Sequence, residues 1–225
     1  MDNFATVKEA VTELRKEKFV VVSYNLPGTE LFGTLHMSIS DATGDNAILE
    51  YIDGKLIIHH DPSYLVMTNS PIYEEQLAIN NYWKDIQGTK MLPGTNRAAD
   101  RFVRGSFYIN AVPKTDDIKV AVPIVFSVIR NLSVPYGIST ENQPNISSTR
   151  WRTVSDQKNL IYYYEDILNP NVVWLNFKNL DFSKPDPKKE LKVKKLVLEG
   201  SNYNYSGESS DGLIESEPFE FAKPE

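Results

Sequence analysis

Residues 33–60 contain the hairpin signal that most restricts how this chain can fold. Asp53-Gly54 separates two runs of apolar and β-branched residues, 47–52 and 55–59, and an Asp-Gly pair in that position is typical of a two-residue β-hairpin turn. The preceding residues 33–40 alternate between apolar and polar side chains, and a turn-forming run, 41–45, joins them to the next strand. The apolar face of residues 33–40 consists of Leu35, Met37 and Ile39. The pattern predicts an antiparallel meander of about four strands, ending with residues 65–68.

Helical spacing and β-branched runs divide the rest of the chain into further elements. Helices are predicted over residues 6–17, 72–86, 97–112 and 116–132, and further strands over 19–23, 149–155, 159–165, 172–177 and 191–199. Helix, strands, helices and strands in this order are typical of an α+β fold in which helices cover two antiparallel sheets. We expect one domain over residues 1–183, followed by an edge strand and a loosely ordered, polar tail over residues 184–225.

Composition excludes several classes of function. The net charge of −6 does not favour nucleic-acid binding, and no apolar run approaches the roughly 20 residues of a membrane-spanning helix. The chain has no cysteine, which removes disulfides, cysteine-based zinc sites and a cysteine nucleophile of its own. His36, His59 and His60 are the three histidines. We expect each to be hydrogen-bonded or on the surface, and we expect neither a metal site nor a cofactor.

The stretch from Leu65 to Trp83 joins an apolar run to a helical pattern through the polar corner Thr68-Asn69-Ser70-Pro71. A bend between two regular elements is a suitable place for a reactive group. The uncharged Asn69 amide carries two N–H donors, which is what a developing oxyanion needs. The alternative is that Asn69 only caps the following helix, where Asn and Ser are common, and on this stretch alone that alternative is favoured.

Four segments together resemble the choloylglycine hydrolase family of linear amide C–N hydrolases, which includes penicillin V acylases and bile salt hydrolases. The segments are SDATGDNAILEYIDGKL, VMTNSPIYEEQL, LPGTNRAADRFVR and STRWRTVSDQKNLIYYYE, in the order and approximate spacing of the family. The resemblance extends over residues 3 to about 183 and is closer to the penicillin V acylases of Gram-negative bacteria. It implies the N-terminal nucleophile hydrolase fold, a four-layer αββα sandwich.

In that family the nucleophile is an N-terminal cysteine whose own α-amine serves as the general base. The resemblance implies that Asn69 contributes to the oxyanion hole and that Arg101 is the active-site arginine, with Arg104 pointing elsewhere or acting in support. Without the resemblance, an ion pair between Arg101 and Asp100 on the helix surface would be the default. Tyr73 and Trp151 are further candidates for substrate contact. The segment of the family that carries the cysteine has no counterpart here, so the fold is expected to be incomplete and to lack its N-terminal strands.

Two functional hypotheses follow. In the first, the intact protein hydrolyses a small linear amide such as penicillin V or a conjugated bile acid, and this chain alone is inactive because it contains no cysteine. In the second, the chain is a non-catalytic remnant or ligand-binding module, with a groove lined by Tyr73, Tyr82, Trp83 and Trp151. The resemblance implies a homo-tetramer for the intact form. Location stays open: the sequence as given has no signal peptide and is consistent with the cytoplasm, and with the periplasm if a signal lies upstream.

Overall fold

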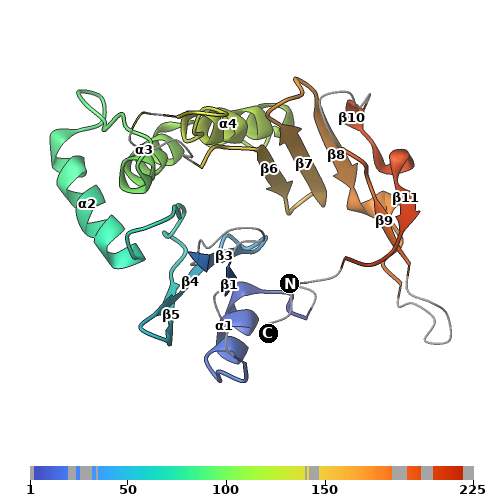
Figure 1. Ribbon diagram of the computed structural model, residues 1–225, viewed down its shortest axis with the longest axis horizontal. Helices are drawn as coiled ribbons and strands as arrows, with labels where there is room; N and C mark the ends of the chain where they lie inside the picture. The colour runs from blue at the N-terminus through green and yellow to red at the C-terminus, as the bar shows by residue number, and fades with distance from the viewer. Residues whose placement is uncertain are drawn as a thin grey trace. The chain divides into compact units, whose positions relative to one another are not determined.

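A computed structural model describes residues 3–19, 24–25, 32–33, 35–139, 141, 147–183, 192–198 and 205–219 of the chain (Figure 1). It divides into two compact units, Met1–Pro113 and Lys114–Glu225. The predicted boundary between residues 183 and 184 stays a prediction. The predicted strand at residues 19–23 lies, apart from Phe19, outside the described residues.

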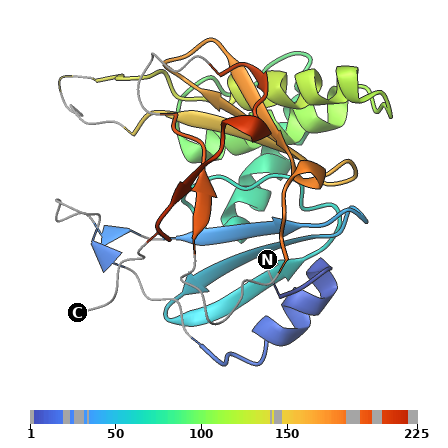
Figure 2. The same ribbon diagram turned by 90° about the vertical axis from the view of Figure 1, so that its right-hand side faces the viewer.

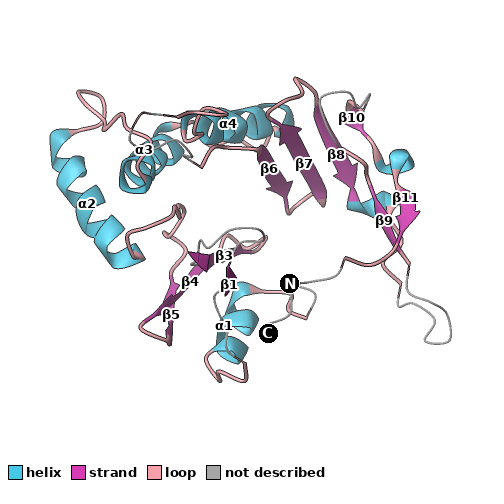
Figure 3. Ribbon diagram, viewed as in Figure 1, coloured by secondary structure: helices cyan, strands magenta, loops and turns pink. Residues whose placement is uncertain are grey.

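The first unit contains helices on both sides of an antiparallel sheet (Figure 3). Its elements are α1 (Val7–Leu14), β1 (Tyr24–Asn25), β2 (Phe32–Gly33), β3 (His36–Ser40), β4 (Asn46–Ile52), β5 (Lys55–His60), α2 (Tyr73–Ile86) and α3 (Ala98–Ala111). In the described residues, β3, β4 and β5 form one sheet in that order, and β1 pairs with β2. Thr6 and Glu9 form a capping box at the start of α1.

Strand β4 separates two apolar clusters because its side chains alternate between the faces of the sheet. Ala47 and Leu49 pack with Val7, Ala10 and Val11 of α1, which lies along one face of the sheet in Figure 2. Ile48 points the other way and packs with Tyr73 of α2 and Phe102 of α3. The sheet therefore positions α2 and α3, the two helices that flank the candidate site.

The Asp53-Gly54 hairpin is confirmed. Ile52 pairs with Lys55, and Asp53 and Gly54 have φ angles of 50° and 76°, as a type I′ turn requires at its two central residues.

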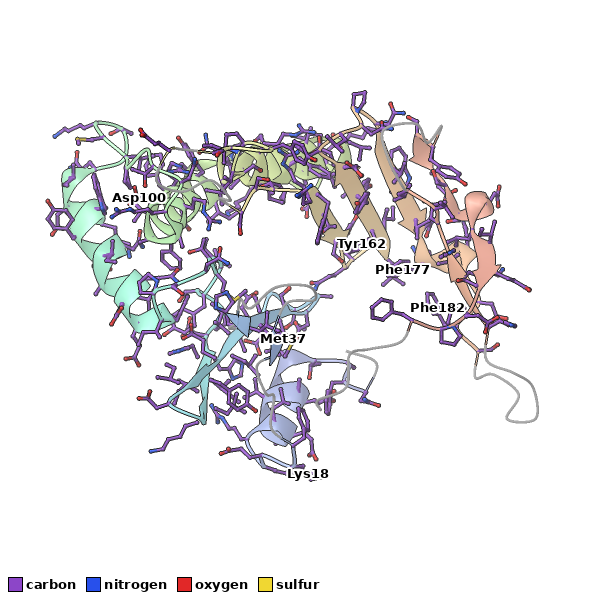
Figure 4. All side chains as sticks on the ribbon, viewed as in Figure 1. Lys18, Met37, Asp100, Tyr162, Phe177 and Phe182 are labelled. Carbon is purple, nitrogen blue, oxygen red and sulfur yellow. The ribbon has the colours of Figure 1, made fainter. Side chains whose placement is uncertain are left out.

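The predicted face of residues 33–40 is only partly covered. Ile39 is buried, whereas Met37, labelled in Figure 4, is 47% exposed and Leu35 is 72% exposed. Helix α1 has only eight residues, and its cluster reaches Ile39 but neither of the other two side chains.

The prediction of a strand at residues 65–68 is wrong. This segment is irregular, and the described part of the meander contains three strands. The carbonyl groups of Thr68 and Asn69 are bound by the side chain of Gln76, so side-chain hydrogen bonds hold residues 68–69 where a neighbouring strand would otherwise do so.

The second unit packs a helix on an antiparallel hairpin. Its elements are α4 (Ile118–Asn131), β6 (Trp151–Asp156), β7 (Ile161–Asp166), β8 (Val172–Asn176), the 3₁₀ helix η1 (Phe177–Asn179), β9 (Val193–Lys195), β10 (Gly207–Glu208), the 3₁₀ helix η2 (Ser210–Gly212) and β11 (Ile214–Ser216). Val122 and Phe126 of α4 pack with Val154 of β6. The predicted strands at 149–155, 159–165 and 172–177 are confirmed with small changes at their ends. Tyr162, Phe177 and Phe182 form a contiguous aromatic group in this unit (Figure 4).

The C-terminal segment contains more regular structure than its composition indicates. β10 pairs in parallel with β8, and β11 pairs antiparallel with β9, so that Ile214 lies opposite Lys195. Polar composition predicts a loose tail because it gives no information about pairing partners distant in the sequence. No helix in the described ranges is long and apolar enough to cross a membrane.

Candidate active site

Asn69 and Arg101 lie in direct contact within the first unit. Nη2 of Arg101 donates a hydrogen bond to Oδ1 of Asn69 at 2.7 Å, and its Nε donates to the carbonyl oxygen of Asn96 at 3.1 Å. A guanidinium group only donates, so the Asn69 atom that faces it must be the oxygen. The Nδ2 amide group of the exposed Asn69 side chain therefore faces away from Arg101.

The Arg101 guanidinium is partly buried, and a second cation lies nearby. Burial, followed by the positive charge of Arg104, lowers the pKa of Arg101. The usual pKa of an arginine side chain lies so far above neutral pH that Arg101 remains a cation. Asn69 Oδ1 thus accepts a charge-assisted hydrogen bond, which polarises the amide and makes its N–H groups better donors.

Asn69 does not cap α2. The N-cap position is Ile72, which makes no side-chain cap hydrogen bond, and the amide of Tyr73 donates instead to Oε2 of Glu50 at 3.0 Å. The capping alternative for Asn69 is therefore wrong. Glu50 supplies the negative charge that a helix N-terminus favours.

The buried side chain of Gln76 forms hydrogen bonds with the polar corner at residues 68–71. Its side chain is 1% exposed, and Nε2 donates to the carbonyl oxygens of Asn69 at 2.6 Å and Pro71 at 2.5 Å. Its Oε1 accepts from the Thr68 hydroxyl at 2.8 Å. Gln76 and Arg101 thus fix the backbone and the side chain of Asn69, respectively.

Arg104 and Asp100 secure the loop that precedes α3. Arg104 is buried, and its Nη1 donates to the carbonyl oxygens of Pro93 at 2.8 Å and Thr95 at 2.9 Å. The carboxylate of Asp100 accepts from the backbone and hydroxyl of Thr95. Arg104 therefore points toward this loop and forms no hydrogen bond with Asn69, while Asp100 is engaged with Thr95. A supporting role for Arg104 in catalysis stays a prediction.

Each of the three histidines lies close to a carboxylate. His59 Nε2 lies 3.3 Å from Oε2 of the buried Glu50, and His36 Nδ1 lies 3.9 Å from its Oε1. His60 contacts Asp45 at 2.8 Å. The prediction that the histidines are hydrogen-bonded or on the surface is confirmed for His59 and His60. His36 is half-buried and lies at ion-pair distance from Glu50. Among the residues that the structure describes, no cluster of three or more His, Cys, Asp or Glu side chains could hold a metal ion.

Tyr73 and Trp151 are the other two candidate residues, and Tyr73 forms no hydrogen bond with Asn69 or Arg101. Tyr73 is 1% exposed in the core, where its ring packs against those of Tyr64 and Phe102. Trp151 is 59% exposed and belongs to the second unit. Substrate contact by either residue stays a prediction.

Glu50, Thr68 and Gln76 support the site but were not predicted from the sequence. One feature of the sequence could have identified Gln76. Within residues 72–86, helical spacing aligns Gln76 with the apolar residues Ile72, Ile79 and Trp83. A polar residue at an expected core position requires a buried hydrogen-bond partner. Which partner it has depends on the fold.

Comparison with known proteins assigns the chain to a family. Residues 1–190 match the model of the linear amide C–N hydrolases, choloylglycine hydrolase family. The chain belongs to the choloylglycine hydrolase family. Its sequence is 47% identical to a penicillin V acylase of Pectobacterium atrosepticum over 99% of this chain and 61% of that protein.

Solved structures of choloylglycine hydrolases agree with this assignment. A penicillin V acylase from Agrobacterium tumefaciens superposes with a TM-score of 0.84 and 55% identity over 98% of this chain and 66% of that one. A variant of the conjugated bile acid hydrolase from Clostridium perfringens gives a TM-score of 0.66 and 25% identity over 80% and 60% of the two chains. The predicted α+β, N-terminal nucleophile hydrolase-like fold is confirmed. The chain spans less than two thirds of the length of these relatives.

Proposed function

We propose that this chain forms part of an enzyme that hydrolyses a linear amide C–N bond, with Asn69 and Arg101 in its active site. The hydrogen bond of 2.7 Å from Arg101 to Asn69 carries the proposal. Family membership supports the reaction class.

Asn69 serves as an oxyanion-hole donor. When a nucleophile attacks an amide carbonyl, negative charge develops on the oxygen and is stabilised by donors fixed in advance. Arg101 occupies Oδ1 of Asn69 and leaves Nδ2 to donate, while Gln76 holds the backbone of the same residue. Two independent attachments keep the donor in place before the substrate binds.

The nucleophile comes from outside these 225 residues, because the chain contains no cysteine. By analogy with the family, the thiolate of an N-terminal cysteine attacks the carbonyl carbon and its α-amine takes the thiol proton. The proton is then given to the leaving amine, and water hydrolyses the resulting thioester. We accordingly propose that the 225 residues alone do not catalyse the reaction.

We propose a penicillin V-like amide as the substrate. Identity is 47% and 55% to two penicillin V acylases and 25% to the bile acid hydrolase. The alternative is a conjugated bile acid.

The test begins with the DNA upstream of the Met1 codon. An in-frame cysteine at a processing point supports the proposal, and the purified product of the whole gene should then release phenoxyacetate from penicillin V. An Asn69→Ala variant of that product should lose activity while retaining its melting temperature. An in-frame stop close upstream, with no companion segment that carries a cysteine, would refute catalysis and favour the remnant hypothesis.

A further inference from the structure

The first unit contains a cavity of about 860 Å³ between α2, α3 and the segments 63–66 and 87–92. Its walls are mostly apolar and include Tyr64, Leu77, Trp83, Phe102 and Phe107. Cavities of roughly 300 to 1,000 Å³ with apolar walls and a few polar groups are typical of sites for small organic molecules. Neither Asn69 nor Arg101 lines this cavity, so it is distinct from the candidate active site.

Asn80 is a buried polar side chain at the cavity wall. It is 7% exposed, and no residue in the described part of the chain forms a hydrogen bond with its carboxamide. Buried polar groups in folded proteins nearly always have a partner, because leaving one unpaired costs its hydration without a compensating hydrogen bond. Asn80 therefore requires an explanation beyond the packing of α2.

Tyr73 presents a second buried polar group to the same cavity. Its side chain is 1% exposed, and no described residue forms a hydrogen bond with its hydroxyl. Burial, followed by the neighbouring Tyr64, Asp61 and Glu50, raises the pKa of Tyr73. The hydroxyl thus stays protonated, and the acidic residues make the Tyr73 end of the cavity unfavourable for an anion.

Lys84 gives the opposite end of the cavity a positive charge. It follows Asn80 by four residues, which places both side chains on one face of α2, and it is the sole charged residue among the described residues that line the cavity. The Lys84 side chain is exposed, and its ammonium group donates to Oδ1 of the neutral Asn81, a residue outside the cavity lining, at 3.3 Å. Asn80 and Lys84 together offer N–H donors about one helical turn apart.

We propose that this cavity binds an organic carboxylate with an apolar body. The carboxylate accepts hydrogen bonds from Nδ2 of Asn80 and Nζ of Lys84, and the apolar body lies against Leu77 and Phe102. The proposal accounts for the unpaired amide, the aromatic walls and the position of the single cation. It does not depend on catalysis at Asn69.

The experiment compares two probes with the same apolar body. Binding of 4-phenylbutanoate and of 4-phenylbutan-1-ol to the gene product is measured by isothermal titration calorimetry. The carboxylate should bind at least about tenfold more tightly than the alcohol, since hydrogen bonds to charged groups contribute about 1.5 to 3 kcal/mol. Equal affinities, or no binding of the acid, would overturn the proposal.

Variants locate the bound acid. Lys84→Gln and Asn80→Leu should each weaken binding of the carboxylate about five- to tenfold and leave the alcohol within about twofold, because they remove donors that only the carboxylate uses. Lys90→Gln removes the same charge at a residue outside the cavity and should change neither affinity. If Asn80→Leu does not fold, the Lys84→Gln variant and the comparison of the acid with the alcohol still test whether the cavity binds the carboxylate.

Arg101→Gln separates this site from the candidate active site. It should leave binding of 4-phenylbutanoate unchanged. If it abolishes binding while Lys84→Gln does not, the acid occupies the Asn69–Arg101 site and the proposal is wrong. Loss of hydrolytic activity in the same Arg101 variant tests the proposed function separately.

Discussion

Nη2 of Arg101 and Oδ1 of Asn69 lie 2.7 Å apart, although the two residues are separated by 32 positions in the sequence. Because the guanidinium can only donate, it determines which end of the Asn69 amide is presented as a donor.

Asn69→Ala removes the proposed oxyanion donor. In the catalytically complete gene product it should lower kcat by about 10² to 10³, the usual cost of losing one such donor, with little change in KM. Asn69 is exposed, so thermal unfolding should move little. A fall in kcat that is accompanied by a clear fall in melting temperature would indicate a structural role for Asn69.

Gln76→Leu removes the buried side chain that forms hydrogen bonds with the loop at residues 68–71. Three carbonyl groups lose the partner that Gln76 supplies, and the Thr68 hydroxyl keeps only its bond to the Ala98 carbonyl oxygen. The free energy of unfolding should therefore fall by about 2 to 4 kcal/mol. Glu75→Gln, on the exposed side of α2, serves as the control and should be nearly neutral. Urea denaturation measures the free energy of unfolding of both variants. Similar values would contradict the proposed role of Gln76 in holding the loop at residues 68–71.

Arg152 should contribute more to stability than Arg130, although both bind Glu165. Nη1 of Arg152 lies 3.0 Å from the carboxylate and its side chain is 9% exposed, whereas Arg130 approaches to 2.6 Å with a side chain 48% exposed. Solvent screens the exposed pair. Arg152→Ala should cost about 3 kcal/mol and Arg130→Ala about 1 kcal/mol in chemical denaturation, and the reverse order would refute this ranking.

Glu165 should make the protein less stable in acid. Burial raises its pKa, but the hydrogen bonds and charges of Arg130 and Arg152 outweigh burial and leave the pKa lowered. A carboxyl group whose folded pKa lies below the unfolded value contributes stability that is present above the unfolded pKa and lost as pH falls through the folded one. Melting temperature measured between neutral pH and pH 3 should fall less steeply for Glu165→Gln than for the wild type. Parallel curves would contradict the prediction.

Gly54→Ala tests the hairpin. Gly54 has a φ angle of 76° with open space around its Cα, so an alanine there is strained by backbone conformation alone. Unfolding free energy should fall by about 1 kcal/mol. Gly94, which also has open space but no positive φ, is the matched control, and its change to alanine should be nearly neutral.

The sequence determined elements whose signals are local. The Asp53-Gly54 turn, the Thr6–Glu9 capping box and strands β6, β7 and β8 of the second unit follow from patterns only a few residues long. Turn chemistry, capping and side-chain alternation act between neighbours, so they can be recognised without a fold. Asn69 and Arg101 became candidates through the resemblance of linked segments to a family.

Tertiary structure decided what each of these residues does. Helical spacing aligned Ile72, Gln76, Ile79 and Trp83, whereas the buried side of α2 consists of Tyr73, Gln76 and Asn80. Gln76 is buried because the loop at 68–71 presents carbonyl oxygens to it, and Glu50 reaches Tyr73 because β4 lies beside the start of α2. A local pattern ranks side chains by polarity, but the partner that satisfies a buried polar group comes from a distant segment and exists only after folding.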